Sequence, residues 1–450
     1  MLYLLDKTIY IYAKFQIILD FDEGKKVIVL INRLNIKLCF FLLSVMFLLG
    51  GCNESSGAEK ELEVLIEPQF QDQVKEAAKY MKEQTPQVSI TIRELPAAGE
   101  ERELEIERLR TQIMAGKGPD VYLINSASDG ATQMEAPLFS NPYKTMQSGA
   151  LASLDRYMES DSYWEEGTYR EEFLLPGKYQ GQQYIIPLSC NFNILASDQE
   201  EIPVTETDTL EDWLAKAEGA ADPGFEAAMY GLENISGNWF QPAADYDEGK
   251  VLFDKEAWET FGMNFLQKKL QWVESGLEDT GEGYQITDLN FATTGMPQMR
   301  SARIIPDIQG NRMAAIRCFG AVGMSSDHKE EAYQFLMLFL NDEIKSARQE
   351  QGIGTFVDGI LGTELPVQES ALAARFPSLD TDGLEMVRDV FLTIDGAYFP
   401  VGVEADLYQA VMDASRLIYG PATDYEAVWR EKLSAAAGKA WENYNTQVLE

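Results

Sequence analysis

The sequence contains very little histidine: His328 is the only one among 450 residues. A zinc site built from several histidines is therefore excluded, and a catalytic triad with histidine as its base is disfavoured. The Gly116-Lys117-Gly118 segment lacks the spacing of a phosphate-binding loop, and Asp380–Gly383 lacks the remaining ligands of a calcium loop. We therefore expect no metal and no cofactor, whereas carboxylate chemistry stays open.

Basic residues are also scarce. The chain has 37 lysines and arginines against 73 aspartates and glutamates, which gives a net charge of −36. Such a chain is a poor partner for nucleic acid, and electrostatic adhesion to anionic lipid is equally disfavoured. The apolar content of 45% is normal for a globular protein, so we expect folded domains rather than disorder.

The apolar run Leu38–Leu49 is too short for a membrane-spanning helix, which needs about 20 residues. With Arg33 and Lys37 before it, the run fits the apolar region of a secretory signal. The following Leu49-Gly50-Gly51-Cys52 resembles the lipobox of bacterial lipoproteins, in which the cysteine receives diacylglycerol and becomes the N-terminus. We expect lipidation at Cys52; the alternative is an ordinary secretory signal with an accidental cysteine.

The segments on either side of this signal carry little structure of their own. Residues 1–32 contain four acidic side chains and do not fit a short basic signal region, so we regard 1–51 as a signal peptide plus a doubtful N-terminal extension. Translation would then begin near Val27 to Leu34. Residues 52–60 are polar without apolar periodicity, which predicts a flexible tether.

Only four cysteines are present. With Cys39 in the signal and Cys52 at the lipid site, Cys190 and Cys318 remain, which is too few for a disulfide framework. These two could form a disulfide or could both be small buried apolar residues.

The first part of the folded chain alternates strands and helices. Apolar and β-branched periodicity predicts strands at 61–66, 87–93 and 120–124, and helices at 72–83 and 101–115. In the second helix, Leu104, Ile106, Leu109, Ile113 and Met114 are expected to form an apolar stripe. This alternation favours an α/β fold with a mostly parallel sheet.

The later sequence is less regular. Strands are expected at 184–187, 191–196 and 314–323. Helices are expected at 210–220 (with Thr209 as a possible N-cap), 255–276, 328–340, 385–393, 404–419 and 425–444, so the C-terminal part is mainly helical.

Six segments, taken in order, resemble the family 1 extracellular solute-binding proteins of ABC importers, the maltose-binding-protein-like group. They are Arg108–Ile124, Ser148–Asp155, Gly177–Ala196, Thr209–Ala217, Ile304–Met324 and His328–Leu340. Each is weak alone, but their order and spacing cover nearly all of the chain after Cys52.

The resemblance implies a two-lobed periplasmic-binding-protein-like fold of type II, with lobes joined by crossing strands and a helical C-terminus. One lobe would combine 61–187 with 321–370, and the other would combine 188–320 with 371–450. The crossings would lie near Pro187–Asn191 and Phe319–Gly323, which raises the chance that Cys190 and Cys318 are neighbours.

Ligands of open α/β sheets bind at the carboxyl ends of strands and between domains. A sugar needs aromatic faces together with amide, carboxylate or hydroxyl side chains. The segments expected at these places supply Gln69, Phe70, Asn125, Ser126, Asn191, Asn193, Trp239 and Tyr398. The alternative role of each aromatic residue is packing in a core or a lobe. The alternative role of Asn191 and Asn193 is hydrogen bonding to backbone groups near the crossing.

Together these features predict a monomeric, non-enzymatic receptor held at the outer face of a Gram-positive-like cell membrane by diacylglycerol on Cys52. It would capture a small solute, expected to be a mono- or oligosaccharide, and deliver it to an ABC transporter permease. The alternatives are a ligand-binding co-receptor for a sensor kinase and a glycoside hydrolase that uses two carboxylates.

Overall fold

The computed structural model describes residues 60–130, 135–164, 169–218, 220–276, 283–295, 299–340, 364–421 and 424–449. Lys60 to Glu450 belong to one compact unit. The signal, the lipid site Cys52 and the tether up to Glu59 lie outside the described residues, so those expectations stay predictions. Among the helices that are described, none combines the length and apolar character needed to cross a membrane.

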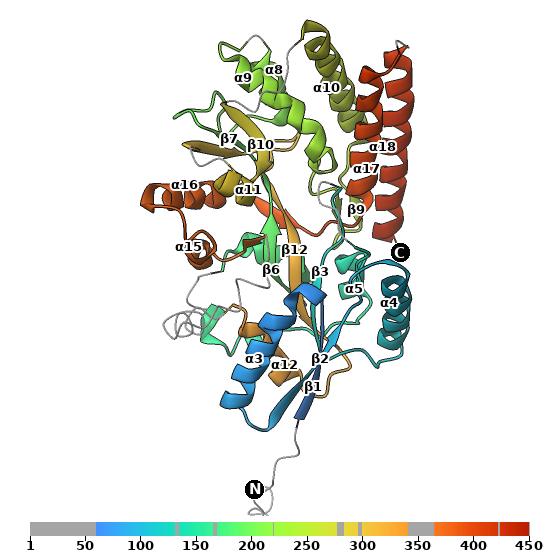
Figure 1. The fold of residues 1–450 in the computed structure, drawn as a ribbon. Coiled ribbons are helices and arrows are strands. Elements are labelled where there is room, and N and C mark those ends of the chain that lie inside the picture. Colours follow the sequence, from blue (N-terminus) through green and yellow to red (C-terminus); the bar gives the residue numbers. More distant parts are fainter. Residues whose placement is uncertain are drawn as a thin grey trace, which may run out of the picture. The chain divides into compact units, whose positions relative to one another are not determined.

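The chain begins with three parallel strands connected by two helices. These are β1 (Lys60–Ile66), α3 (Gln71–Gln84), β2 (Val88–Glu94), α4 (Gly99–Met114) and β3 (Val121–Asn125). β1 lies between β2 and β3, so the two connections run in opposite directions across the sheet. Right-handed crossovers then put α3 and α4 on opposite faces, as Figure 1 shows. All five predicted elements are confirmed.

The buried face of α4 differs from the predicted apolar stripe. Ile106 and Leu109 are buried, but Leu104 is 60% and Met114 is 89% exposed. The side chain that takes part of the buried face is Arg102, which is 2% exposed. Its guanidinium makes two hydrogen bonds to the carboxylate of Glu67, at 2.9 and 3.0 Å, so a distant partner overrides the local hydrophobic pattern.

The main sheet has seven strands and is mixed. Its order is β13 (Leu365–Pro366), β6 (Ile185–Asn191), β12 (Met313–Val322), β3, β1 and β2, and β14 (Gly396–Tyr398) pairs with β12. The β12–β14 pair is parallel, but the pairs β12–β3, β12–β6 and β13–β6 are antiparallel. The prediction of a mostly parallel sheet is therefore wrong, because β12 enters the sheet from a different part of the fold rather than through a βαβ crossover.

A three-stranded sheet in the order β10 (Tyr284–Asp288), β7 (Asn193–Ser197) and β11 (Ser301–Ile304) forms the second layer of strands. The chain passes into it at Phe192, where β6 ends and β7 begins. It returns to the main sheet between Ile304 and Met313, earlier than the crossing expected at Phe319–Gly323. The glycine of that expected crossing, Gly320, instead allows close packing: an added Cβ would lie 2.7 Å from Leu336.

Helices surround both sheets. In chain order they are α5 (Pro142–Gln147), α6 (Asp155–Met158), α7 (Glu171–Leu174), α8 (Leu210–Ala217), α9 (Pro223–Ala228), α10 (Lys255–Ser275), α11 (Leu289–Gly295), α12 (Lys329–Met337), α15 (Leu372–Arg375), α16 (Thr381–Leu392), α17 (Val403–Arg416) and α18 (Tyr425–Leu449). The six helices predicted after residue 209 are all present as α8, α10, α12, α16, α17 and α18, with ends that differ by up to five residues, and the other α-helices of this part were not predicted. The 3-10 helices are η1 (Pro68–Phe70), η2 (Ser162–Trp164), η3 (Leu175–Gly177), η4 (Met229–Asn238), η5 (Glu369–Ala371) and η6 (Leu417–Tyr419), and two short hairpins pair β4 (Lys178–Tyr179) with β5 (Gln182–Gln183) and β8 (Ala244–Asp245) with β9 (Lys250–Val251).

Local sequence signals explain several helix ends. Thr209 caps α8 through a capping box, accepting from the Asp212 backbone while the Asp212 side chain accepts from the Thr209 backbone. Asp380 caps α16 by accepting a hydrogen bond from the Gly383 backbone at 2.9 Å. The resemblance of Asp380–Gly383 to a calcium loop therefore has a simpler origin in helix capping.

The buried apolar residues form two cores. One core lies around the main sheet and includes residues of β1, β3, β6 and β12. The other is helical and aromatic: Trp239 packs edge-to-face on Phe261 and Phe265, and α10, α17 and α18 enclose it. The protein therefore has the expected two-lobed α/β fold with a helical C-terminus. Cys190 and Cys318, on neighbouring strands β6 and β12, are both free and buried.

Candidate functional site

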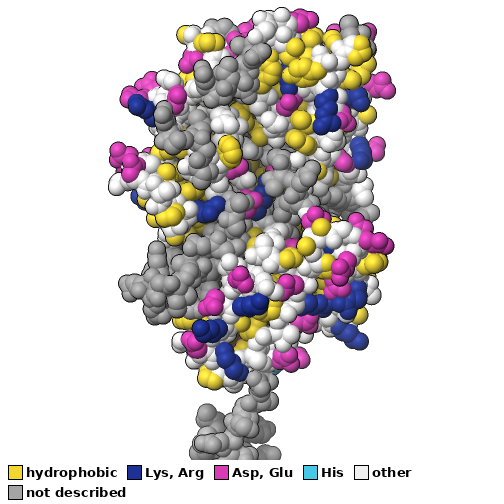
Figure 2. All heavy atoms as spheres, viewed as in Figure 1, with side chains coloured by type: hydrophobic (Ala, Val, Ile, Leu, Met, Phe, Trp, Pro, Cys, Tyr) yellow, Lys and Arg dark blue, Asp and Glu magenta, His cyan; other side chains and the backbone are white. Residues whose placement is uncertain are grey.

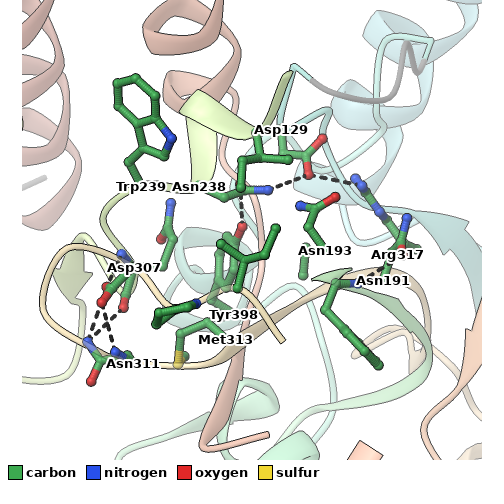
Figure 3. A pocket seen from close by; sticks show the side chains of 16 residues that line it. Asp129, Asn191, Asn193, Asn238, Trp239, Asp307, Asn311, Met313, Arg317 and Tyr398 are labelled. Carbon is green, nitrogen blue, oxygen red and sulfur yellow. Dashed lines mark hydrogen bonds and ion pairs between the residues drawn. The ribbon is translucent and has the colours of Figure 1, made fainter. Parts of the chain in front are cut away.

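A polar cavity lies where the two sheets meet. The space between its lining residues, counting the opening to solvent, is about 480 Å³. It is lined from β12, from the junction of β6 and β7, from the end of η4 and from the loop that leads into β12 (Figure 3). The lining residues come from five separated stretches of sequence, so only the folded chain brings them together.

One wall of the cavity is a hydrogen-bonded network centred on Asp129. Its Oδ2 atom accepts from the Arg317 guanidinium at 2.9 Å and from the Asn238 amide at 3.1 Å. Asn238 Oδ1 accepts in turn from the Tyr398 hydroxyl at 2.7 Å (Figure 3). Arg317 lies at an irregularity in β12, between the pairs Ile316–Cys190 and Cys318–Ser189. A bulge of this kind redirects a side chain, here toward Asp129.

The opposite wall is a loop organised by Asp307. This carboxylate accepts from the backbone N–H groups of Gln241, Gln309 and Asn311, at 2.8 to 3.0 Å, and from the Asn311 side chain at 3.2 Å. Burial raises the pKa of Asp307 above the usual carboxyl value, although these donors oppose the rise. The loop therefore holds Asn311 in a fixed position at the cavity, as Figure 3 shows.

Four of the eight predicted ligand residues line this cavity: Asn191, Asn193, Trp239 and Tyr398. Asn191 ends β6 and Asn193 starts β7. The Trp239 side chain is fully buried, and its indole N–H donates to the Leu232 carbonyl at 3.1 Å. The Trp239 ring therefore belongs to the helical core, which favours its packing role. Tyr398 is 3% exposed and contributes through its hydroxyl.

The other four predicted residues lie away from the cavity lining. Gln69 is exposed in η1, and Phe70 is 2% exposed in the main core. Asn125 is half-buried at the end of β3, and its backbone N–H donates to the Glu67 carboxylate. Ser126 is fully buried, and its hydroxyl has no hydrogen-bond partner among the described residues. Any role for these four in ligand binding stays a prediction.

Six further lining residues were not predicted from the sequence: Asp129, Asn238, Gln241, Asp307, Asn311 and Arg317. Two of them had a readable signal. Arg317 is the single charge within the apolar run from Ala314 to Val322, and a lone charge in a buried strand needs a partner. Asn238 precedes Trp239 in the glycine-containing loop 236–240. For the remaining residues, no local sequence pattern predicts a position at the cavity, because that position depends on the tertiary fold.

A second, smaller cavity adjoins the first and shares Gln241 and Tyr398 with it; the space between its lining residues, counting the opening to solvent, is about 210 Å³. Its buried acid is Glu404, whose Oε2 atom accepts from the Val401 backbone at 3.0 Å and whose Oε1 atom accepts from the Tyr444 hydroxyl at 3.1 Å. Burial raises the pKa of Glu404 to about 7, although its hydrogen-bond donors oppose the rise. This carboxyl therefore titrates near neutrality. Across the described ranges, no group of three or more histidine, cysteine, aspartate or glutamate side chains could hold a metal ion.

Comparison with solved structures identifies the fold. The chain is similar to an extracellular solute-binding protein of family 1 from Alicyclobacillus acidocaldarius, with 13% identity, a TM-score of 0.56 and coverage of 88% of this chain and 100% of that one. It is also similar to the sugar-binding protein MalE from Xanthomonas citri (11% identity, TM-score 0.54, 87% and 98% coverage). A periplasmic oligogalacturonide-binding protein from Yersinia enterocolitica matches with 15% identity, a TM-score of 0.52 and 85% and 100% coverage.

Neither family models nor curated protein sequences give a match to this chain. At 11–15% identity, the structural likeness shows a shared fold. The fold is that of the family 1 extracellular solute-binding proteins, as the sequence resemblance implied.

Proposed function

We propose that this chain is a lipid-anchored receptor that captures a carbohydrate between its two lobes and delivers it to the permease of an ABC importer. The lobes would follow the expected boundaries, 61–187 with 321–370 and 188–320 with 371–450, except that the second crossing moves to between Ile304 and Met313, because β12 belongs to the main sheet. Closure of the lobes around the ligand would create a distinct state that a transporter can recognise without touching the ligand.

The observation that carries this proposal is the composition of the larger cavity. Its polar lining includes the side chains of Asn191, Asn193, Asn238, Gln241 and Asn311, which offer both donors and acceptors to hydroxyl groups. Its charged side chains are compensated within the protein: Asp129 by Arg317, and Asp307 by N–H donors. Such a lining suits a neutral polyhydroxylated solute better than an ion.

The solved structures support the same class of ligand. The Xanthomonas citri protein is described as sugar-binding, and the Yersinia enterocolitica protein as oligogalacturonide-binding. These are binding proteins, which favours a receptor over the glycoside hydrolase alternative. A co-receptor for a sensor kinase would need the same cavity, and a neighbouring gene for a permease or for a kinase would distinguish these two roles.

A thermal-shift screen against mono- and oligosaccharides tests the ligand. Ligand at about 100 times its dissociation constant adds about 2.7 kcal/mol of stability, so a bound sugar should raise the melting temperature measurably. A tenfold loss of affinity in Asn193→Ala should reduce this gain to about 1.4 kcal/mol, whereas Asn234→Ala, an exposed change in η4, should preserve the full shift. No shift with any saccharide would contradict the carbohydrate proposal, and turnover of a glycoside would contradict a receptor without enzymatic activity.

The anchor is tested separately in cells. Because two acyl chains hold a protein on a membrane where one is marginal, the protein made with Cys52 intact should fractionate with membranes and incorporate labelled palmitate. Cys52→Ser should remove the label and release the protein into the medium. Retention of the label in Cys52→Ser would rule out lipidation at this residue.

A further inference from the structure

Strand register places Glu364 beside the larger cavity. β13 pairs antiparallel with β6, with Leu365 opposite Cys190 and Pro366 opposite Ser189. Continuing this register by one residue puts Glu364 opposite Asn191. On the other side, Asn191 lies opposite Ala315, which lies opposite Tyr398. Residues opposite one another on neighbouring strands point to the same face of the sheet. Asn191, Ala315 and Tyr398 line the cavity. Glu364 is not itself among the lining residues, but this register puts it at the end of the row that faces the cavity, next to Asn191.

The electrostatic surroundings of Glu364 give the same location independently. The charged groups that act on it are Arg317, Asp288, Asp129 and Arg375. Arg317 and Asp129 are the buried pair in the cavity wall. Asp288 lies opposite Asn193, another lining residue. Charges on β12, β10 and the loop after β3 thus all act on Glu364, which agrees with a position near Asn191 and Asn193.

The carboxylate of Glu364 has unused hydrogen-bonding capacity. Its Oε2 atom is buried and has no hydrogen-bond partner among the described residues. The two carboxylates that line the cavity, Asp129 and Asp307, each accept from two or more donors. Burial raises the pKa of Glu364 to about 7, with Arg317 opposing the rise. An unpaired buried acceptor is costly to a protein, and a ligand that donates to it would offset that cost.

We propose that Glu364 is a ligand-binding residue of the cavity that accepts hydrogen bonds from the saccharide and excludes saccharides bearing a carboxylate. This inference rests on the proposed function and adds the specificity of the same site. A sugar hydroxyl or a protonated amine can donate to Glu364. A uronate brings a second negative charge to a partly desolvated carboxylate, and like charges at such a site repel strongly.

Two matched sets of hexoses test the inference: glucose, glucosamine and glucuronate, and galactose, galactosamine and galacturonate. Dissociation constants are measured by titration calorimetry at pH 6 and pH 8 for the wild type, Glu364→Gln and Glu385→Gln. Glu385 is an exposed carboxylate on α16 and serves as the control. We expect the wild type at pH 8 to bind the uronate at least about tenfold more weakly than the neutral hexose.

In the wild type, the ratio of the uronate and hexose dissociation constants should grow between pH 6 and pH 8, as Glu364 loses its proton. In Glu364→Gln this ratio should fall to within about twofold and should no longer change with pH. Glu385→Gln should behave as the wild type. If the amino sugar loses more affinity than the neutral sugar in Glu364→Gln, an ammonium is the preferred donor; equal losses identify a hydroxyl, and both results support the role. An unchanged uronate-to-hexose ratio in Glu364→Gln would overturn the inference while leaving the proposed function intact. If no hexose in either set binds the wild type, the inference is contradicted, whereas the proposed function is contradicted only if no mono- or oligosaccharide raises the melting temperature.

Discussion

The guanidinium of Arg317 and the carboxylate of Asp129 form an ion pair 2.9 Å long, with both side chains no more than 3% exposed. The pair joins β12 to the loop after β3 at the wall of the larger cavity. Asp129 also holds Asn238, which accepts from Tyr398. Four distant parts of the chain, the loop after β3, η4, β12 and β14, are thus connected through one buried charge pair.

Breaking this pair should destabilise the protein strongly. Arg317→Met leaves Asp129 as an uncompensated buried charge, and the loss of one partner of a buried pair costs on the order of 3–5 kcal/mol. Urea unfolding monitored by tryptophan fluorescence would measure the change. The double variant Arg317→Met with Asp129→Leu should recover much of the lost stability, because both charges are then absent.

An exposed ion pair provides the control. Arg430 and Glu426 on α18 lie 3.0 Å apart with about 60% of each side chain exposed. Arg430→Met should cost less than about 1 kcal/mol. Equal losses for Arg317→Met and Arg430→Met would show that burial does not give the Arg317 pair its importance.

Gly237 is predicted to tolerate no side chain. A Cβ atom there would lie 2.3 Å from the Asp129 carbonyl oxygen and 2.6 Å from that of Glu404. Because both atoms belong to the backbone, Gly237→Ala should cost about 1–3 kcal/mol and lower the melting temperature. Gly438→Ala in α18 is the matched control: its Cβ meets nothing within 4 Å, and alanine favours a helix by up to about 1 kcal/mol. A gain in stability from Gly237→Ala would contradict this close approach.

The sequence was most informative where a structure depends on local pattern. The amphipathic spacing of Val74, Ala77 and Met81 predicts α3, and Thr209 correctly marks the start of α8. Both depend on neighbours within one helical turn, so no tertiary information is needed.

Predictions failed where the position of a side chain depends on a partner that is distant in the sequence. The burial of Arg102 depends on Glu67, 35 residues away, and the local pattern favoured Leu104 instead. Asp129 and Arg317 are 188 residues apart, so their meeting is invisible in sequence spacing. Trp239 lines the cavity just after η4, but sequence alone could not decide whether its indole faces the cavity or the core.

Glu404 should give the protein a measurable pH dependence. Its pKa is raised to about 7 in the folded protein, from 4.5, so the folded state binds a proton that the unfolded state has released. Stability from this group is present below about pH 4.5 and is lost as the pH rises through 7. The difference in melting temperature between the wild type and Glu404→Gln should therefore change between pH 5 and pH 8. A constant difference across this range would contradict the raised pKa.

Cys190 and Cys318 should be unreactive in the native protein. Both thiols are buried and free, and burial raises the pKa of each well above the usual thiol value, so little nucleophilic thiolate forms. Iodoacetamide labelling followed by peptide mass spectrometry should modify both only after denaturation. Rapid native labelling, or recovery of a peptide pair linked by a disulfide, would contradict this state.

Calorimetric titration with the best saccharide from the thermal-shift screen is the sharpest test of a sugar site in the larger cavity. We expect saturable binding with one site per chain to the wild type and to Asn234→Ala. Binding should weaken at least about tenfold in Asn193→Ala, because a lost hydrogen bond in a buried site leaves its ligand partner unsatisfied. Unchanged affinity in Asn193→Ala together with unchanged affinity in Asn238→Ala would place the ligand outside this cavity and contradict the account.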